Sequence, residues 1–72
     1  MATQIVMDHT GDTRHQFDAA DAAAVAEAEK RFKKLTGAGF AAKRLGEGKS
    51  EVIRIFEPTA DETLFIPRLQ GG

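Results

Sequence analysis

The sequence predicts an α+β fold in which one helix packs across a mixed β-sheet. Three observations indicate it: an alanine-rich segment with helical periodicity, five short segments with the composition of strands, and glycine-containing turns between them. A single helix with one apolar stripe needs a sheet to cover, because it cannot bury that stripe alone. The chain has 72 residues. We therefore expect one domain over residues 1–67, followed by a flexible C-terminal tail, residues 68–72.

The first element that the pattern predicts is a β-hairpin over residues 3–17. An apolar run that ends at Met7 is followed by a Thr-Gly-Asp turn cluster and by a second extended run that ends at Phe17. Side chains alternate between the two faces of a strand. We expect the inner faces to carry Thr3, Ile5 and Met7 in the first strand, and His15 and Phe17 in the second.

A helix is predicted over residues 18–36. Asp18 is a good N-cap residue with Asp21 at the third helical position, and Phe17 precedes it as a hydrophobic staple. Gly37 is expected to end the helix as a left-handed C-cap. The apolar stripe that faces the sheet consists of Val25, Ala28, Phe32 and Leu35. The exposed side carries the i,i+4 pairs Glu27–Arg31 and Glu29–Lys33.

Three further strands follow the helix. Two extended runs, residues 40–45 and 51–56, are joined by a glycine-rich hairpin turn, and a turn over residues 57–62 leads to a last strand over residues 63–66 that Pro67 closes. The order strand, strand, helix, strand, strand, strand (ββαβββ), with a right-handed crossover, places the last strand beside the first. That arrangement is a β-grasp. Its sheet core is expected to comprise Ile5, Met7, Phe17, Ile53, Ile55, Leu64 and Ile66.

Composition excludes several classes of protein. There is no cysteine, so disulfides and thiolate metal clusters are absent, and a reducing, cytoplasmic location is expected. No apolar run has the length of a membrane-spanning helix, and no secretory signal is visible. Twelve of the hydrophobic residues are alanine, which leaves eighteen large ones for a core. A domain of this size does not easily enclose a small-molecule cleft, so we expect no catalytic residues, no cofactor and no enzyme activity of its own.

Charge is unevenly distributed along the chain. Residues 1–29 carry a formal −5, residues 30–54 carry +6 and residues 55–72 carry −2, which sum to the net −1. A basic middle segment is typical of a solvated helix face, and it is also typical of a docking surface for an acidic partner. Nucleic acid is disfavoured because no aromatic residues interleave with the basic ones. The candidate docking patch comprises Lys30, Lys33, Lys34, Lys43 and Arg44.

Two histidines and two aspartates gather around the first turn: Asp8, His9, Asp12 and His15. These residue types can ligate a metal ion, but their spacing matches no established motif, and aspartate is an ordinary turn residue. We therefore expect no metal site.

The C-terminal residues Asp61 to Gly72 form the most specific feature of the chain. An acidic turn, an apolar strand, a proline and a Gly-Gly end resemble the C-terminus of the small sulfur-carrier subunit of molybdopterin synthase and its thiamine-pathway relative, and Arg-Leu-Gln-Gly-Gly is similar to the tail of ubiquitin. The resemblance covers about residues 56–72 and implies a ubiquitin-like protein. It implies that Gly72 is the reactive residue and that the adjacent Gly71 passes through a narrow channel of the activating enzyme. The implied recognition segment is Pro67, Arg68, Leu69 and Gln70.

In those families an ATP-dependent activating enzyme adenylates the terminal carboxylate, which then becomes a thiocarboxylate or passes to a target lysine. The resemblance thus implies a modifier or a sulfur carrier, monomeric, with an activating enzyme and an acceptor protein or sulfur-transfer enzyme as partners and no membrane contact. The alternative is a non-catalytic module, such as a phage or mobile-element accessory protein, that binds protein or nucleic acid through the basic helix end and the sheet surface.

Overall fold

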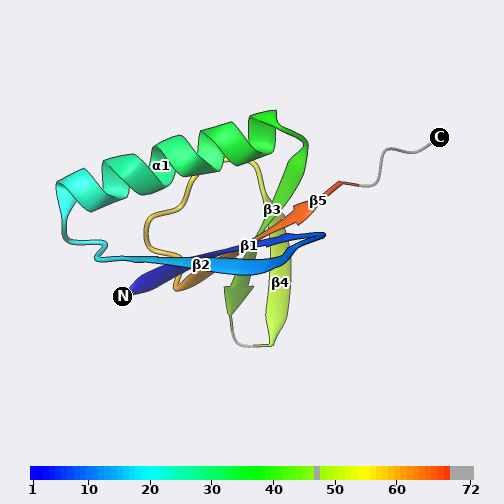
Figure 1. Cartoon of the computed structure of the whole chain (residues 1–72). Helices are drawn as coiled ribbons and strands as arrows, with labels where there is room; N and C mark the ends of the chain where they lie inside the picture. Colours follow the sequence, from blue (N-terminus) through cyan, green and yellow to red (C-terminus); the bar gives the residue numbers. More distant parts are fainter. Residues whose placement is uncertain (47, 69–72) are drawn as a thin grey trace.

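The computed structural model describes residues 1–46 and 48–68, which form one helix and a five-stranded mixed sheet (Figure 1). The elements are β1 (Ala2–Asp8), β2 (Gly11–Phe17), α1 (Ala22–Gly37), β3 (Phe40–Gly46), β4 (Lys49–Ile53) and β5 (Glu62–Pro67). The α+β class is confirmed. Along the chain the elements follow the predicted order, whereas across the sheet the order is β2-β1-β5-β3-β4.

Strand β5 occupies the centre of the sheet. It runs parallel to β1 and antiparallel to β3, so the last strand lies beside the first, as predicted. The backbone N–H of Thr3 donates to the carbonyl of Asp61, 2.8 Å away, just before β5 begins. The two hairpins, β1–β2 and β3–β4, therefore join through β5.

The helix begins one turn later than the sequence predicts. Asp21, not Asp18, is the N-cap: its Oδ1 accepts hydrogen bonds from the N–H groups of Ala23 and Ala24 at 3.0 and 3.3 Å. Asp18 instead holds the preceding turn, where its Oδ1 accepts from the N–H of Ala20 at 2.9 Å. Both aspartates suit a cap, and Asp21 takes the role because its carboxylate reaches two free N–H groups of the first helical turn.

The helix also ends later than predicted. Gly37 belongs to the helix, and Ala38 is the cap residue, with its N–H shared between the carbonyls of Lys34 and Leu35 at 3.0 Å each. The positive φ of +98° occurs at Gly39. The prediction of a left-handed cap at Gly37 was wrong because the chain reverses only after Ala38, which has an ordinary negative φ.

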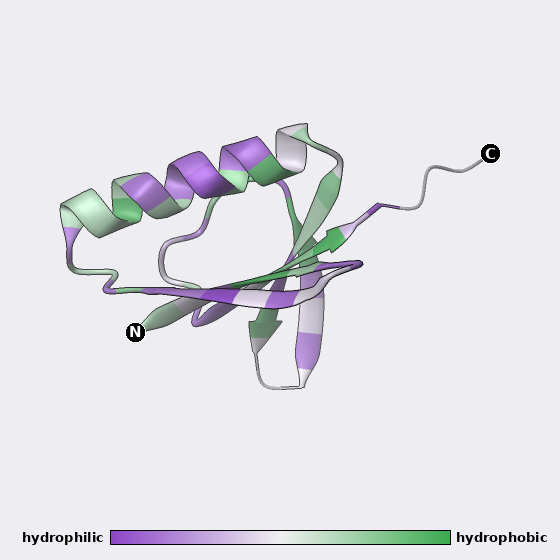
Figure 2. Ribbon diagram, viewed as in Figure 1, coloured by the Kyte–Doolittle hydropathy of each residue, from purple (hydrophilic) through white to green (hydrophobic). Residues whose placement is uncertain are grey.

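The predicted apolar stripe of α1 is confirmed and packs on the sheet. Ala28 and Phe32 are buried, and Val25 and Leu35 are half-buried beside them. Hydrophobic residues lie along β1 and β5 in the middle of the sheet (Figure 2). One core cluster contains Ala2, Phe17 and Ala28, and a second contains Phe32, Ala42 and Phe65. Phe56 contacts both clusters, with ring centroids 6.2 Å from Phe17 and 5.8 Å from Phe32.

The face of β1 that packs against the helix is opposite to the predicted one. Gln4 is fully buried and bonds to the helix, so residues of even number in β1 face α1 and those of odd number face away. Met7, expected to be inside, is 44% exposed. Ile5 is buried as predicted, but on the face of the sheet that points away from α1. The face towards α1 carries Gln4, which is accommodated because both ends of its amide are hydrogen-bonded.

In β5 the side chain that packs against α1 is Phe65, whose ring lies 5.7 Å from that of Phe32. Its neighbours Leu64 and Ile66, which were expected in the core beneath the helix, alternate with Phe65 and so belong to the opposite face, where they are half-buried.

Strand β4 is shorter than the predicted strand over residues 51–56. It begins at Lys49 and ends at Ile53, after which the chain bends at residues 54–55. Ile55, predicted in the core, is 78% exposed, whereas Phe56 turns back under the helix. The strand ends early because the chain bends to place Phe56 between the two core clusters. Alternation of side chains along the sequence does not reveal this bend.

Candidate functional site

The base of the C-terminal segment is held at the junction of α1 and β3. Pro67 ends β5 as predicted and pairs with Phe40 in the sheet register. The backbone N–H of Arg68 donates to the carbonyl of Gly39 at 2.9 Å. Both Pro67 and Arg68 are exposed. The other predicted tail residues, Leu69, Gln70, Gly71 and Gly72, lie outside the described residues.

The five residues of the candidate basic docking patch do not share one surface. Lys30, Lys33 and Lys34 are exposed on α1, where Lys33 pairs with Glu29 at 3.8 Å in the predicted i,i+4 arrangement. Lys43 and Arg44 are consecutive in β3 and therefore point to opposite faces of the sheet. Lys43 and Arg44 therefore cannot both lie on one surface with the helix lysines.

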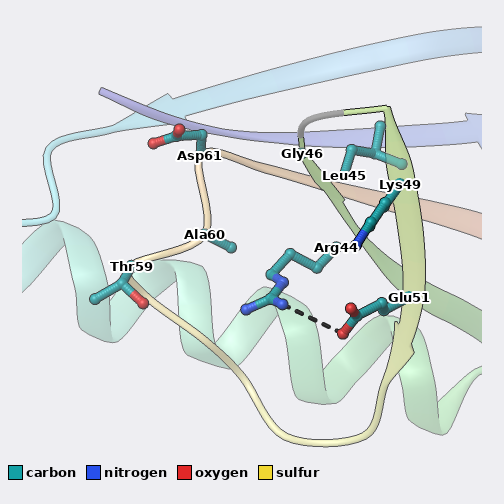
Figure 3. A pocket seen from close by; sticks show the side chains of 8 residues that line it. All are labelled: Arg44, Leu45, Gly46, Lys49, Glu51, Thr59, Ala60 and Asp61. Carbon is teal, nitrogen blue, oxygen red and sulfur yellow. Dashed lines mark hydrogen bonds and ion pairs between the residues drawn. The ribbon is translucent and has the colours of Figure 1, made fainter.

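Arg44 belongs to a cleft of about 360 Å³ between the β3–β4 hairpin and the segment before β5 (Figure 3). Its guanidinium donates to Glu57 at 3.1 Å and to Glu51 at 3.2 Å. The far wall of the cleft contains Thr59 and Asp61. Arg44 therefore ties the irregular segment to β4, and its charge is compensated from within the chain. The sequence indicated the charge but not these two partners.

A second cleft, of about 570 Å³, lies beside the base of the C-terminal segment. We call it the β3 notch. Its apolar lining consists of Phe40, Ala41, Ala42, Val52 and Ile53, and its polar lining of Thr36, Arg54 and Arg68. Sequence reasoning missed it, because a strand continuing to residue 56 would have covered this part of β3.

A polar cluster crosses from the sheet to the helix near β2. The buried Gln4 amide donates through Nε2 to the carbonyl of Ala28 at 3.0 Å and accepts through Oε1 from Arg31 Nη1 at 2.7 Å. Arg31 thus binds Gln4, where the sequence predicted a pair with Glu27. Burial, and to a lesser extent the charge of Arg31, lower the pKa of His15 below its ordinary value. These contacts satisfy a buried amide, so the cluster is structural.

The polar residues of the first turn have structural partners. Asp8 Oδ1 accepts from Thr10 Oγ1 at 2.6 Å and from Thr10 N at 2.9 Å, and these bonds lower the pKa of the Asp8 carboxyl. Asp12 pairs with Arg14 at 3.5 Å. Across residues 1–46 and 48–68 the side chains of histidine, aspartate and glutamate form no group of three that could hold a metal ion.

Within the part of the chain that the structure describes, no helix is long and apolar enough to cross a membrane. Comparisons with models of known protein families, with curated proteins and with solved structures found no significant match.

Proposed function

We propose that this chain is a small carrier or modifier of the β-grasp type that acts through the carboxylate of Gly72. The observation that carries the proposal is the position of β5. This central strand ends at the exposed Pro67, the exposed Arg68 follows it, and the sequence then runs to Gly71 and Gly72. The parallel pairing of β1 and β5 supports the β-grasp arrangement, because it is the pairing expected from that crossover.

A carrier of this type needs an exposed strand end and no catalytic groups of its own, which fits a domain of this size. The cleft at Arg44 and the β3 notch open beside charged residues that are paired or exposed, and the core consists of two small clusters. In the proposed reaction the partner enzyme supplies the catalytic groups and this chain supplies one carboxylate. A carboxylate oxygen of Gly72 attacks the α-phosphorus of ATP, which forms an acyl adenylate and releases pyrophosphate. A sulfur nucleophile of the partner then displaces AMP.

The bond between Arg68 and Gly39 sets how far the carboxylate can reach. Four residues follow Arg68, and an extended chain spans at most about 3.3–3.6 Å per residue, so the reach is about 14 Å. In the proposed reaction Gly71 and Gly72, which have no Cβ, fit a channel of the partner that is too narrow for other residues. A partner whose reaction centre lies within this reach of its surface is therefore suited to this chain.

The test is an activation assay on a chain whose last residue is Gly72, produced directly or by cleavage after that residue. The protein is incubated with Mg-ATP and each candidate adenylating enzyme from the same genome, and its intact mass is measured. We expect an adenylate, a thiocarboxylate or a conjugate, and we expect loss of the adduct on deletion of Gly72. The matched control is Gly37→Ala, since an added Cβ at this helical glycine meets no atom within 4 Å.

An adduct that persists after deletion of Gly72, or the absence of any adduct with every candidate enzyme, would contradict the proposal. Binding of a partner without an adduct would instead support the alternative of a non-catalytic binding module.

A further inference from the structure

The β3 notch is a gap in the hydrogen-bonded sheet. Strand β3 begins at Phe40, and its first two residues pair on one side with Pro67 and Ile66 of β5. On the other side β4 pairs with β3 only from Ala42 onward, opposite Ile53. The backbone of Phe40 and Ala41 therefore has a neighbouring strand on one side only, and the notch occupies the place where β4 would have continued.

Strand β4 is itself an edge of the sheet. An antiparallel edge strand leaves every second residue with its N–H and C=O directed away from its partner, which is a template for another strand. Two large apolar side chains are exposed along this edge and the bend that follows it: Val52 is 63% exposed and Ile55 is 78% exposed. The edge thus has both free backbone groups and an uncovered apolar surface.

The rim of the notch is positively charged. Arg54 and Arg68 both line it and both are exposed. No aspartate or glutamate is among the described residues that line the notch, and no described carboxylate lies within ion-pair distance of either arginine. This distinguishes the notch from the Arg44 cleft, where two glutamates compensate the guanidinium.

We propose that the β3 notch binds an extended acidic segment of a partner protein by strand addition to β3, at the open side of Phe40 and Ala41. Because Val52 and Ile53 face opposite sides of the sheet, the apolar side chains of the segment cover Ile53 alone, and the carboxylates that alternate with them bind Arg54 and Arg68. Charge complementarity selects this occupant, because two guanidinium groups at the rim of an apolar cleft match alternating acidic and apolar side chains. The inference concerns the sheet edge and does not depend on activation of Gly72.

The test uses a seven-residue peptide of alternating valine and glutamate, blocked at both ends, and ¹⁵N-labelled protein. Titration followed by amide chemical shifts is expected to move the resonances of Phe40, Ala41 and Val52. A matched peptide with lysine in place of glutamate is expected not to bind. Raising NaCl from about 50 to about 500 mM should weaken binding of the acidic peptide, because the pairs on the rim are exposed to solvent.

Charge reversal at the rim tests the two arginines. The double variant Arg54→Glu/Arg68→Glu is expected to weaken binding by about tenfold or more, since each reversal replaces an attraction by a repulsion. The control Arg14→Glu makes the same type of change on β2 at the other edge of the sheet and should leave the affinity within about twofold. Far-UV circular dichroism checks that each variant is folded.

Three outcomes overturn the proposal: shifts that cluster on β2, equal binding of the lysine peptide, and unchanged affinity of the double variant. Absence of any shift up to millimolar peptide also overturns it.

Discussion

Replacement of Phe56 by alanine is expected to be among the most destabilising substitutions outside the regular elements. The ring lies 6.2 Å from Phe17 and 5.8 Å from Phe32 and contacts both core clusters. Truncation of a fully buried phenylalanine costs about 3–5 kcal/mol, and Phe56 is half-buried. We therefore expect a loss of about 2 kcal/mol, a large part of the roughly 4–11 kcal/mol that a 72-residue domain has in total.

The assay is urea and thermal unfolding followed by circular dichroism. A loss of about 2 kcal/mol corresponds to a decrease in Tm of about 8–16 °C for a domain of this size. The matched control is the preceding residue: Ile55→Ala removes a large apolar side chain that is 78% exposed, and it should change stability by less than about 0.5 kcal/mol. An equal or larger loss in Ile55→Ala would refute the reasoning, because it would mean that β4 continues and buries Ile55.

The other stability predictions concern the polar cluster between sheet and helix. Arg31→Ala leaves Gln4 Oε1 buried without its donor and should lower the free energy of unfolding in urea by about 1–3 kcal/mol. The control Lys30→Ala changes an exposed neighbour and should change stability by less than about 0.5 kcal/mol. Equal effects of the two variants would contradict the role of the Gln4 bond. Because burial lowers the pKa of His15 in the folded state, stability is highest above the unfolded pKa of about 6.5 and falls as pH decreases through the folded pKa. Unfolding measured from about pH 8 to about pH 5 should show a shallower decline for His15→Gln than for the original protein, and identical pH profiles would contradict this prediction.

Periodicity and turn chemistry predicted the order of the elements and the buried stripe of α1, because both are expressed in the spacing of neighbouring residues. The inner face of β1 could not be predicted in this way. A buried Gln4 becomes acceptable only when Arg31 and the carbonyl of Ala28 are brought to it by the tertiary fold. The helix start had the same difficulty, since Asp18 and Asp21 are equally good caps until the chain path decides which carboxylate faces the free N–H groups.

The candidate site divides in a similar way. The charge of Arg44 and Arg68 is visible in the sequence. The pairing of Arg44 with two glutamates, and the position of Arg68 at the rim of a notch whose described lining contains no aspartate or glutamate, depend on where β4 ends. The bend after Ile53 opens the β3 notch, and it arises because Phe56 packs between the two core clusters. A local pattern does not contain this long-range requirement.

The central position of β5 has a consequence for the order of folding during synthesis. Each hairpin can close by itself, since its two strands are near neighbours in the chain, but β5 must join β1 across more than fifty intervening residues. A ribosome therefore releases the two hairpins and the helix before the strand that unites them. Until residues 62–67 emerge, β1 and β3 each lack their neighbour in the sheet, and these exposed edges are where a nascent chain would pair with the wrong strand.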